Sequence, residues 1–234
     1  TIDTAVIDWL LEGDAAVRWQ VERDLLDRPV DQWSATRSSV ATEGWGRALL
    51  DRQDDDGRWG GGWYSPKWTS TTYTLLLLAR LGLADDLAGP RRGCRRLLDD
   101  ARWVDGGVSY WASHRSPELC VNAMVLSVCS AFGVDDDRVD GIARMLIDQR
   151  LGDGGWNCRS GHGDTHSSFH TTISTLEGLH RWAAFRRAGD ADEAIGTGLE
   201  FMLVHRLFRS HRSGDVIEPE WLTPHFPPRW HYDT

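Results

Sequence analysis

The sequence predicts an all-α protein assembled from repeated helix pairs, and three observations point to that fold class. An anchor leucine before a polar stretch recurs every 48 residues, at Leu50, Leu98 and Leu146. After each polar stretch comes a second segment whose apolar residues follow the i, i+3, i+4 spacing of a helix. Strand signals are weak, because no Asn-Gly dipeptide separates two alternating apolar runs. Self-similarity at a fixed period is typical of repeat architectures.

A single domain is predicted over residues 1–234. Its parts are a helical N-terminal segment over 1–39, repeats near 40–90, 91–140 and 141–190, and a divergent fourth repeat over 195–234. Each of the three regular repeats is expected to contain a helix, a Gly-rich turn and a second helix. The fourth repeat lacks the Gly-Gly-Trp turn. Helix pairs that bury only one face need neighbours, so the pairs are expected to pack side by side.

The Gly-rich turns are predicted to be structural. Gln53 precedes Trp59 with one Gly between them, and Gln149 precedes Trp156 with three. Glycine allows the positive φ that such a turn needs, and the tryptophan can pack the turn against its helices. The glutamine can supply a hydrogen bond to the end of an adjoining helix.

Composition excludes several classes of protein. The chain has 26 Lys and Arg against 35 Asp and Glu, a formal charge of −9, which argues against nucleic-acid binding. The longest apolar run, near residues 75–78, is far short of the roughly 20 residues needed to cross a bilayer. Four cysteines are too few for a disulfide scaffold, and no secretory signal opens the sequence. A cytoplasmic protein is expected.

The repeats resemble a known motif. Residues 50–53 with Gly57 and Trp59, and residues 146–149 with Trp156, are similar to the Gln-Trp repeat of squalene and hopene cyclases and their relatives. The resemblance covers most of residues 40–205. It implies an (α/α) toroid in which inner and outer rings of helices surround an active-site cavity.

The same resemblance implies an incomplete ring. A complete toroid of this family has six helix pairs, and this chain has about five. A missing pair would expose an apolar edge, which pairing with a second copy in a homo-oligomer would cover. Cyclases of the hopene type also carry an Asp-x-Asp-Asp motif whose middle Asp protonates the substrate. This sequence has no such motif, which argues against cyclisation started by protonation.

A second resemblance concerns the β-subunit of protein prenyltransferases, which binds Zn²⁺ through an Asp, a Cys and a His. Residues 104–111 and 169–172 are similar to the segments that carry these ligands. Asp105 and His170 match the Asp and the His, whereas Gly107 stands where that family has its Cys. The resemblance implies catalytic roles for Asp105 and His170. A cyclase that uses Asp105 as its acid is the alternative.

Zinc is the predicted cofactor, held by Cys120, Cys158 and His170. Cys120 opens one inner helix, His170 opens the next, and Cys158 follows a Gly-Gly-Trp turn, so a toroid would bring the three together. Two thiolates, one imidazole and an open position form a workable catalytic zinc shell. The alternative is that both cysteines are small buried hydrophobes and that His170 caps a helix start. Of the other cysteines, Cys129 is expected in the core and Cys94 at the surface.

Six further residues are candidate substrate contacts. Aromatic rings can line an apolar cavity and face a cation, and guanidinium groups can hold a diphosphate or a carboxylate. The candidates are Trp103, Tyr110, Trp111, Phe169, Arg206 and Arg209. Plain core packing and a solvated helix face are the alternatives. The sequence therefore predicts an enzyme that processes an isoprenoid or other apolar substrate; the alternative is a non-catalytic toroid that binds a hydrophobic small molecule or a protein partner.

Overall fold

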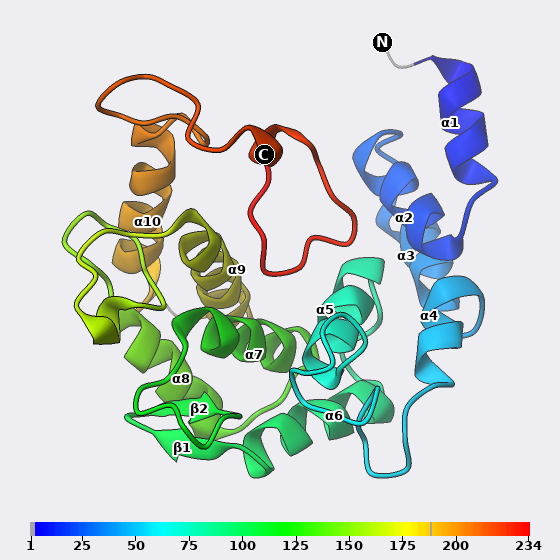
Figure 1. The fold of residues 1–234 in the computed structure, drawn as a ribbon. Coiled ribbons are helices and arrows are strands. Elements are labelled where there is room, and N and C mark those ends of the chain that lie inside the picture. The colour runs from blue at the N-terminus through cyan, green and yellow to red at the C-terminus, as the bar shows by residue number, and fades with distance from the viewer. Residues whose placement is uncertain (1–2, 188) are drawn as a thin grey trace. The chain divides into compact units, whose positions relative to one another are not determined.

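The computed structural model describes residues 3–187 and 189–234. Within those ranges it contains ten α-helices, two short 3₁₀ helices and one two-stranded sheet (Figure 1). The predicted helical fold class is confirmed, and the ring arrangement stays a prediction. None of the helices in the described ranges has the length and apolar character needed to cross a membrane.

The chain divides into two compact units, Thr1–Gly93 and Cys94–Thr234, and the division falls inside α6 (Ala88–Asp99). The other helices of the first unit are α1 (Thr4–Leu11), α2 (Ala15–Asp24), α3 (Val30–Ser39), α4 (Gly44–Leu50) and α5 (Thr71–Leu81). Asp14 caps the N-terminus of α2 by accepting the amide of Ala16 at 2.9 Å. Its second oxygen accepts the amide of Trp45 at 2.7 Å, which fastens the start of α4 to the start of α2.

Two side chains close the C-terminal end of α5. Trp19 Nε1 donates to the carbonyl of Leu81 at 2.9 Å, and Arg37 Nε donates to the carbonyl of Gly82 at 2.6 Å. Gly82 has a φ of 94°, and a Cβ there would lie 2.5 Å from the Trp19 ring. Glycine alone meets both conditions, so α5 ends at this residue.

The second unit is built around α7 and α9. Its elements are β1 (Arg102–Val104), β2 (Gly107–Ser109), α7 (Leu119–Ala131), α8 (Asp137–Asp148), α9 (Phe169–Arg186), α10 (Asp192–Val204), and the 3₁₀ helices Ser160–His162 and Pro219–Leu222. Helix α7 packs along α9 (Figure 1). The helices approach closely because Gly178 lacks a side chain; a Cβ there would lie 2.6 Å from the carbonyl oxygen of Ala123. The carboxyl-terminal segment, red in Figure 1, follows α10.

The same hydrogen bonds recur at two of the Gly-rich turns. Trp59 Nε1 donates to the carbonyl of Leu49 at 2.8 Å, and Trp156 Nε1 donates to that of Leu146 at 2.7 Å. The two backbone amides donate to threonine hydroxyls at 3.0 Å. Both rings are buried, so each tryptophan joins its turn to the preceding helix.

The glycines and Gln53 complete these turns. Gly57 and Gly154 have φ values of 94° and 98°, which favour glycine. Gln53 Nε2 donates to the carbonyl of Gly89 in α6 at 2.8 Å, so it supplies the predicted bond to an adjoining helix. Gln149 is exposed.

One hairpin departs from the predicted all-helical pattern. Strands β1 and β2 pair antiparallel with Val104 opposite Gly107, which leaves Asp105 and Gly106 as a two-residue loop. Both loop residues have positive φ, 46° and 81°, as a type I′ turn requires. Asn122 of α7 holds β2 in place, because its side chain bonds both the amide (2.7 Å) and the carbonyl (3.0 Å) of Val108.

Cys94 corrects one expectation. The residue is fully buried rather than at the surface, whereas Cys129 lies in the core as expected. Cys94, Leu97 and Leu98 share the apolar face of α6 at the i, i+3, i+4 spacing. The two arginines that follow Cys94 in the sequence therefore do not indicate which face of α6 its side chain occupies.

Candidate functional site

An open pocket of about 930 Å³ lies in the second unit. Its walls come from the loop between α8 and α9, the start of α9, the later half of α10 and the segment that follows α10. Phe169, Phe201 and Trp221 provide aromatic surface, and their rings contact one another through Phe169, with centroids 5.1 and 4.7 Å apart. This size is within the usual range of small-molecule sites. We call it the α9–α10 pocket.

Two histidines form a chain in the wall of this pocket. His205 Nδ1 lies 2.8 Å from the carbonyl oxygen of Phe201, and His211 Nδ1 lies 2.8 Å from His205 Nε2. A carbonyl oxygen only accepts, so His205 Nδ1 carries the hydrogen. In the neutral ring His205 Nε2 is then an acceptor, and His211 Nδ1 must donate to it. This arrangement leaves His211 Nε2 as the basic end of the chain.

The turn after α10 creates this pair. Arg206 and Leu207 both have positive φ, 47° and 69°, so the chain reverses directly after His205. Arg209 then donates to the carbonyl of Gly214 at 2.8 Å and closes the loop. The reversal brings His211 back against His205 although the two are six residues apart.

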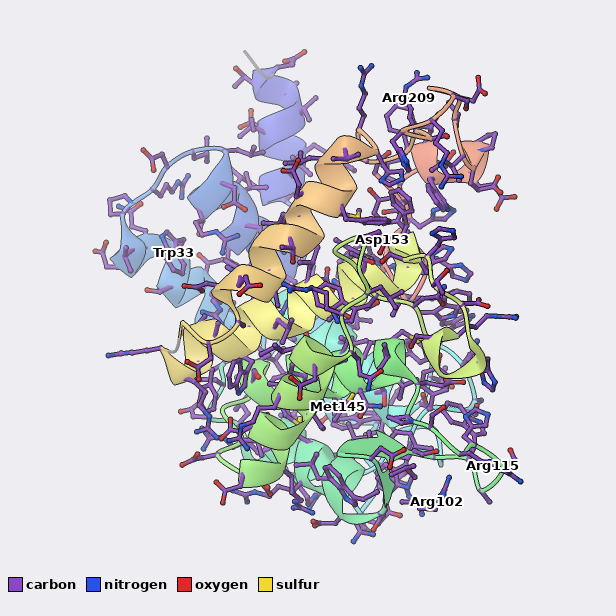
Figure 2. The ribbon with its side chains drawn as sticks, turned by 90° about the vertical axis from the view of Figure 1, so that its left-hand side faces the viewer. Trp33, Arg102, Arg115, Met145, Asp153 and Arg209 are labelled. Atoms are coloured by element: carbon purple, nitrogen blue, oxygen red, sulfur yellow. The ribbon has the colours of Figure 1, made fainter. Side chains whose placement is uncertain are left out.

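The loop between α8 and α9 forms another wall, and Asp153 holds it. The carboxylate of Asp153 accepts the amide of Ser167 at 2.8 Å and also its hydroxyl. Figure 2 labels Asp153 in this loop and Arg209 in the segment beyond α10. Arg212 and Glu200 also line the pocket, so both charge signs are present at its wall.

His170 is hydrogen-bonded to the carboxyl-terminal segment. Its Nδ1 accepts the amide of Tyr232 at 2.7 Å, and its ring contacts the rings of Trp221, Trp230 and His231 edge-on. Burial, and secondly the nearby His231, lower the pKa of His170. The neutral ring that results can accept the Tyr232 amide.

Cys120 and Cys158 are the two predicted ligands that the structure brings together. Cys158 Sγ accepts the backbone amide of Cys120 at 3.1 Å and the hydroxyl of Thr171 at 3.5 Å. Interaction with Cys158, and secondly burial, raises the pKa of the Cys120 thiol, whereas interaction with Cys120 lowers the pKa of Cys158. Thr171 lowers the pKa of Cys158 further. Cys120 and Thr171 lie in the first turns of α7 and α9, so Cys158 faces two helix N-termini, which favour a thiolate.

The predicted zinc shell does not assemble. Among residues 3–187 and 189–234 no group of three His, Cys, Asp or Glu side chains is placed to hold a metal ion. Two sulfurs are adjacent, but His170 Nδ1 is used by Tyr232. The donors that approach Cys158 are N–H and O–H groups, which suit a thiolate without a metal. The zinc site therefore stays a prediction.

Asp105 lies in the β1–β2 turn and is exposed. It lines a second, smaller pocket of about 390 Å³ together with Arg144 and Asp148 of α8. His170 lines the α9–α10 pocket. At the neighbouring Gly107 a Cβ would lie 2.7 Å from that of Pro117, so this backbone has no space for the Cys of the prenyltransferase pattern.

Phe169 alone of the six predicted substrate contacts lines the α9–α10 pocket. Trp103 Nε1 donates to the carbonyl of Leu98 at 3.1 Å, and the Tyr110 hydroxyl donates to that of Leu97 at 2.9 Å. Trp111 stacks on His114, with centroids 4.9 Å apart. The three aromatic residues therefore pack the hairpin region. Arg206 is exposed and Arg209 closes the loop after α10.

Among the pocket residues that the sequence prediction missed are Phe201, His205 and Trp221. His211 meets His205 only because the chain reverses at residues 206–207. No glycine marks that reversal in the sequence. For Asp105 a signal did exist, because Asp-Gly favours a type I′ turn.

No protein-family model, curated protein or solved structure matches this chain.

Proposed function

We propose that this protein is an enzyme that binds an isoprenoid or comparable apolar small molecule in the α9–α10 pocket and moves a proton at the molecule's polar end. The observation that carries the proposal is that three aromatic side chains and the hydrogen-bonded histidine pair line the same pocket. The Gln-Trp resemblance supports the substrate class. A chain of apolar groups would lie along Phe169, Phe201 and Trp221, where burial of apolar surface favours binding.

The histidine pair supplies the chemistry. His211 Nε2 takes a proton from the substrate, and the proton on His211 Nδ1 passes to His205 Nε2. The resulting His205 cation keeps its Nδ1 hydrogen bond to the carbonyl of Phe201, which stabilises the charge. The reverse sequence returns the proton to the product. Arg212 lies in the same wall and suits a carboxylate or phosphate on the substrate.

The proposal uses neither Asp105 nor a zinc ion. Asp105 lines the smaller pocket, and the three predicted zinc ligands do not gather into one shell. In this proposal His170 is a positioning residue, because it holds Tyr232 beside Phe169 (ring centroids 5.4 Å apart).

Equilibrium dialysis with labelled farnesol tests the binding step. Val204 lines the pocket at the end of α10 and is half exposed, so Val204→Trp is expected to fill the pocket and to weaken binding about tenfold or more, equivalent to about 1.4 kcal/mol. Leu203→Trp is the matched control, since Leu203 is exposed one residue earlier. Absence of farnesol binding, or equal loss in both variants, contradicts the proposed site.

Product analysis after incubation with farnesyl diphosphate tests the chemical step. His211→Gln is expected to bind within about twofold of the wild type and to lose roughly 10²–10⁴ in rate, the usual contribution of general acid–base catalysis. His180→Gln, on the exposed face of α9, is the control. If the wild type binds both probes and turns neither over, the protein is the non-catalytic binder instead.

A further inference from the structure

The pair Cys120 and Cys158 has no part in the proposed reaction, yet its surroundings are specific. Cys158 Sγ receives the Cys120 amide at 3.1 Å and the Thr171 hydroxyl at 3.5 Å, so the two cysteines are neighbours. Both residues are half-buried, whereas Cys94 and Cys129 are fully buried. Two donors are therefore directed at the Cys158 sulfur, and the residue beside it carries a second thiol.

We infer that Cys120 and Cys158 form a reversible dithiol–disulfide pair in which Cys158 attacks a small-molecule disulfide and Cys120 resolves the adduct. The inference is independent of the proposed enzyme activity.

The exchange balances with a low-molecular-weight disulfide, RSSR, as oxidant. The Cys158 thiolate attacks one sulfur of RSSR, the S–S bond of RSSR breaks, and one RS⁻ leaves. Cys120 then gives its proton to that thiolate and attacks Cys158 Sγ. The bond between Cys158 and the RS group breaks, and the second RS⁻ leaves and takes up the proton that Cys158 had earlier released. One Cys120–Cys158 disulfide and two RSH are produced from RSSR and two thiols.

The two helices explain which sulfur attacks. The Cys120 amide at the start of α7 and the Thr171 hydroxyl at the start of α9 both point their hydrogens at Cys158 Sγ. These donors stabilise negative charge on Cys158. The pKa of the Cys120 thiol is instead raised, first by its interaction with Cys158 and then by burial, although the Val121 amide acts in the opposite direction. Cys120 therefore keeps its hydrogen until the adduct has formed.

The bond would change the wall of the α9–α10 pocket. Cys158 lies in the loop between α8 and α9, and that loop contributes Asp153, His166 and Ser167 to the pocket. A disulfide to Cys120 would tie the loop covalently to the N-terminus of α7. Oxidation is therefore expected to rigidify this wall.

The second pair in the unit, Cys94 and Cys129, is an internal control. Both are fully buried, the Cys94 thiol faces the carbonyl of Val128 at 3.6 Å, and burial raises the pKa of Cys94. These sulfurs lack both access and donors that stabilise a thiolate. They are expected to remain reduced in the native protein.

The test is incubation of the full chain with oxidised glutathione, followed by alkylation in denaturant and peptide mapping. The expected product links the peptides of Cys120 and Cys158 and leaves Cys94 and Cys129 alkylated. A persistent glutathione adduct on Cys158 in the wild type, or no reaction at either cysteine, overturns the inference, and neither result bears on farnesol binding.

Two variants separate the roles. Cys120→Ser is expected to accumulate the glutathione adduct on Cys158, because the resolving thiol is gone. Cys158→Ser is expected to form the glutathione adduct on Cys120 at least about tenfold more slowly than Cys120→Ser forms it on Cys158, because the thiolate at residue 158 is gone. Equal reaction rates at the remaining cysteine in the two variants contradict the assigned roles. Circular dichroism checks that both variants fold. The cross-linking test on the wild type does not depend on either variant.

Discussion

The indole of Trp156 lies against the backbone of α10, and this contact depends on a residue without a side chain. A Cβ at Gly198 would lie 2.8 Å from the Trp156 ring and from Leu176 Cδ2. The first unit repeats the contact, since a Cβ at Gly93 would lie 2.9 Å from the Trp59 ring. At both places a tryptophan donates its indole N–H to the helix that precedes it in the chain, and its ring packs on a helix that follows it.

Gly198→Ala is expected to lower the free energy of unfolding by about 1–3 kcal/mol, because the new methyl group overpacks a buried contact. Gly196→Ala on the same helix is the matched control, since a Cβ there meets nothing within 4 Å. The control is expected to gain up to about 1 kcal/mol from helix propensity. Urea unfolding measures both, and a stabilised Gly198→Ala would show that the contact is loose.

His170 is expected to hold the carboxyl-terminal segment through one hydrogen bond. His170→Leu keeps an apolar side chain of similar reach but leaves the Tyr232 amide without its acceptor, at a cost of about 1–3 kcal/mol. The expected result is faster limited proteolysis within residues 219–234. His180→Leu, exposed on the same helix, should cleave at the wild-type rate. Unchanged cleavage in His170→Leu would mean that aromatic packing alone holds the segment.

At the scale of elements, α8 begins at a cap that carries a charge. Asp136 Oδ1 accepts the amide of Arg138 at 2.9 Å, and the Arg138 guanidinium contacts both carboxylate oxygens. The hydrogen bonds from Arg138 lower the pKa of Asp136 below its ordinary value of 3.8. A carboxyl group whose pKa is lower in the folded state contributes stability above its unfolded value, and that stability is lost as the pH falls through the folded value.

Asp136→Ala is therefore expected to cost about 1 kcal/mol at pH 7, the usual value of a lost cap. Asp136→Asn keeps an acceptor and loses the charge, so its deficit relative to wild type should shrink below pH 3.8. Denaturant unfolding at pH 7 and pH 3 measures both effects. Asp137→Asn is the control, because Asp137 is the next residue and is exposed. If Asp136→Asn lowers the free energy of unfolding equally at both pH values, the ion pair contributes nothing.

At the scale of the whole molecule, burial is distributed unevenly among the helices. Eleven of the thirteen residues of α7 are buried, whereas α1 has none, and Trp9 of α1 is 69% exposed. Local opening should follow this difference, because segments with few buried contacts open at low free energy. Amides of α7 are expected to exchange most slowly and those of α1 fastest, as hydrogen-exchange mass spectrometry would show.

Strong protection of α1 would contradict that expectation and would indicate that another chain covers it. The self-association predicted from the sequence stays a prediction. Analytical ultracentrifugation of the wild type and of Trp9→Ser, which removes the exposed indole of α1, measures it. The ring of helices likewise stays a prediction.

Much of the fold could be predicted because it depends on local signals. Apolar spacing and a 48-residue period located the helices from α4 to α10, and glycines marked the turns at residues 57 and 154. The β1–β2 hairpin was missed although its Asp-Gly signal is present, since the flanking strands have only three residues each. Cys94 was misplaced because charged neighbours in sequence do not decide which face of a helix a side chain occupies.

The sequence by itself determined that the fold is helical, that helices recur with a period of 48 residues, and which turns need glycine, because those depend on neighbouring residues and on one repeating spacing. Only the tertiary structure decided that His211 meets His205, that Cys158 meets Cys120, and that His170 holds the carboxyl-terminal segment. Each of these contacts depends on packing between elements, or on an unmarked reversal after α10. The packing of the helices decides which side chains distant in the sequence come into contact. The spacing of residue types along the chain does not decide it.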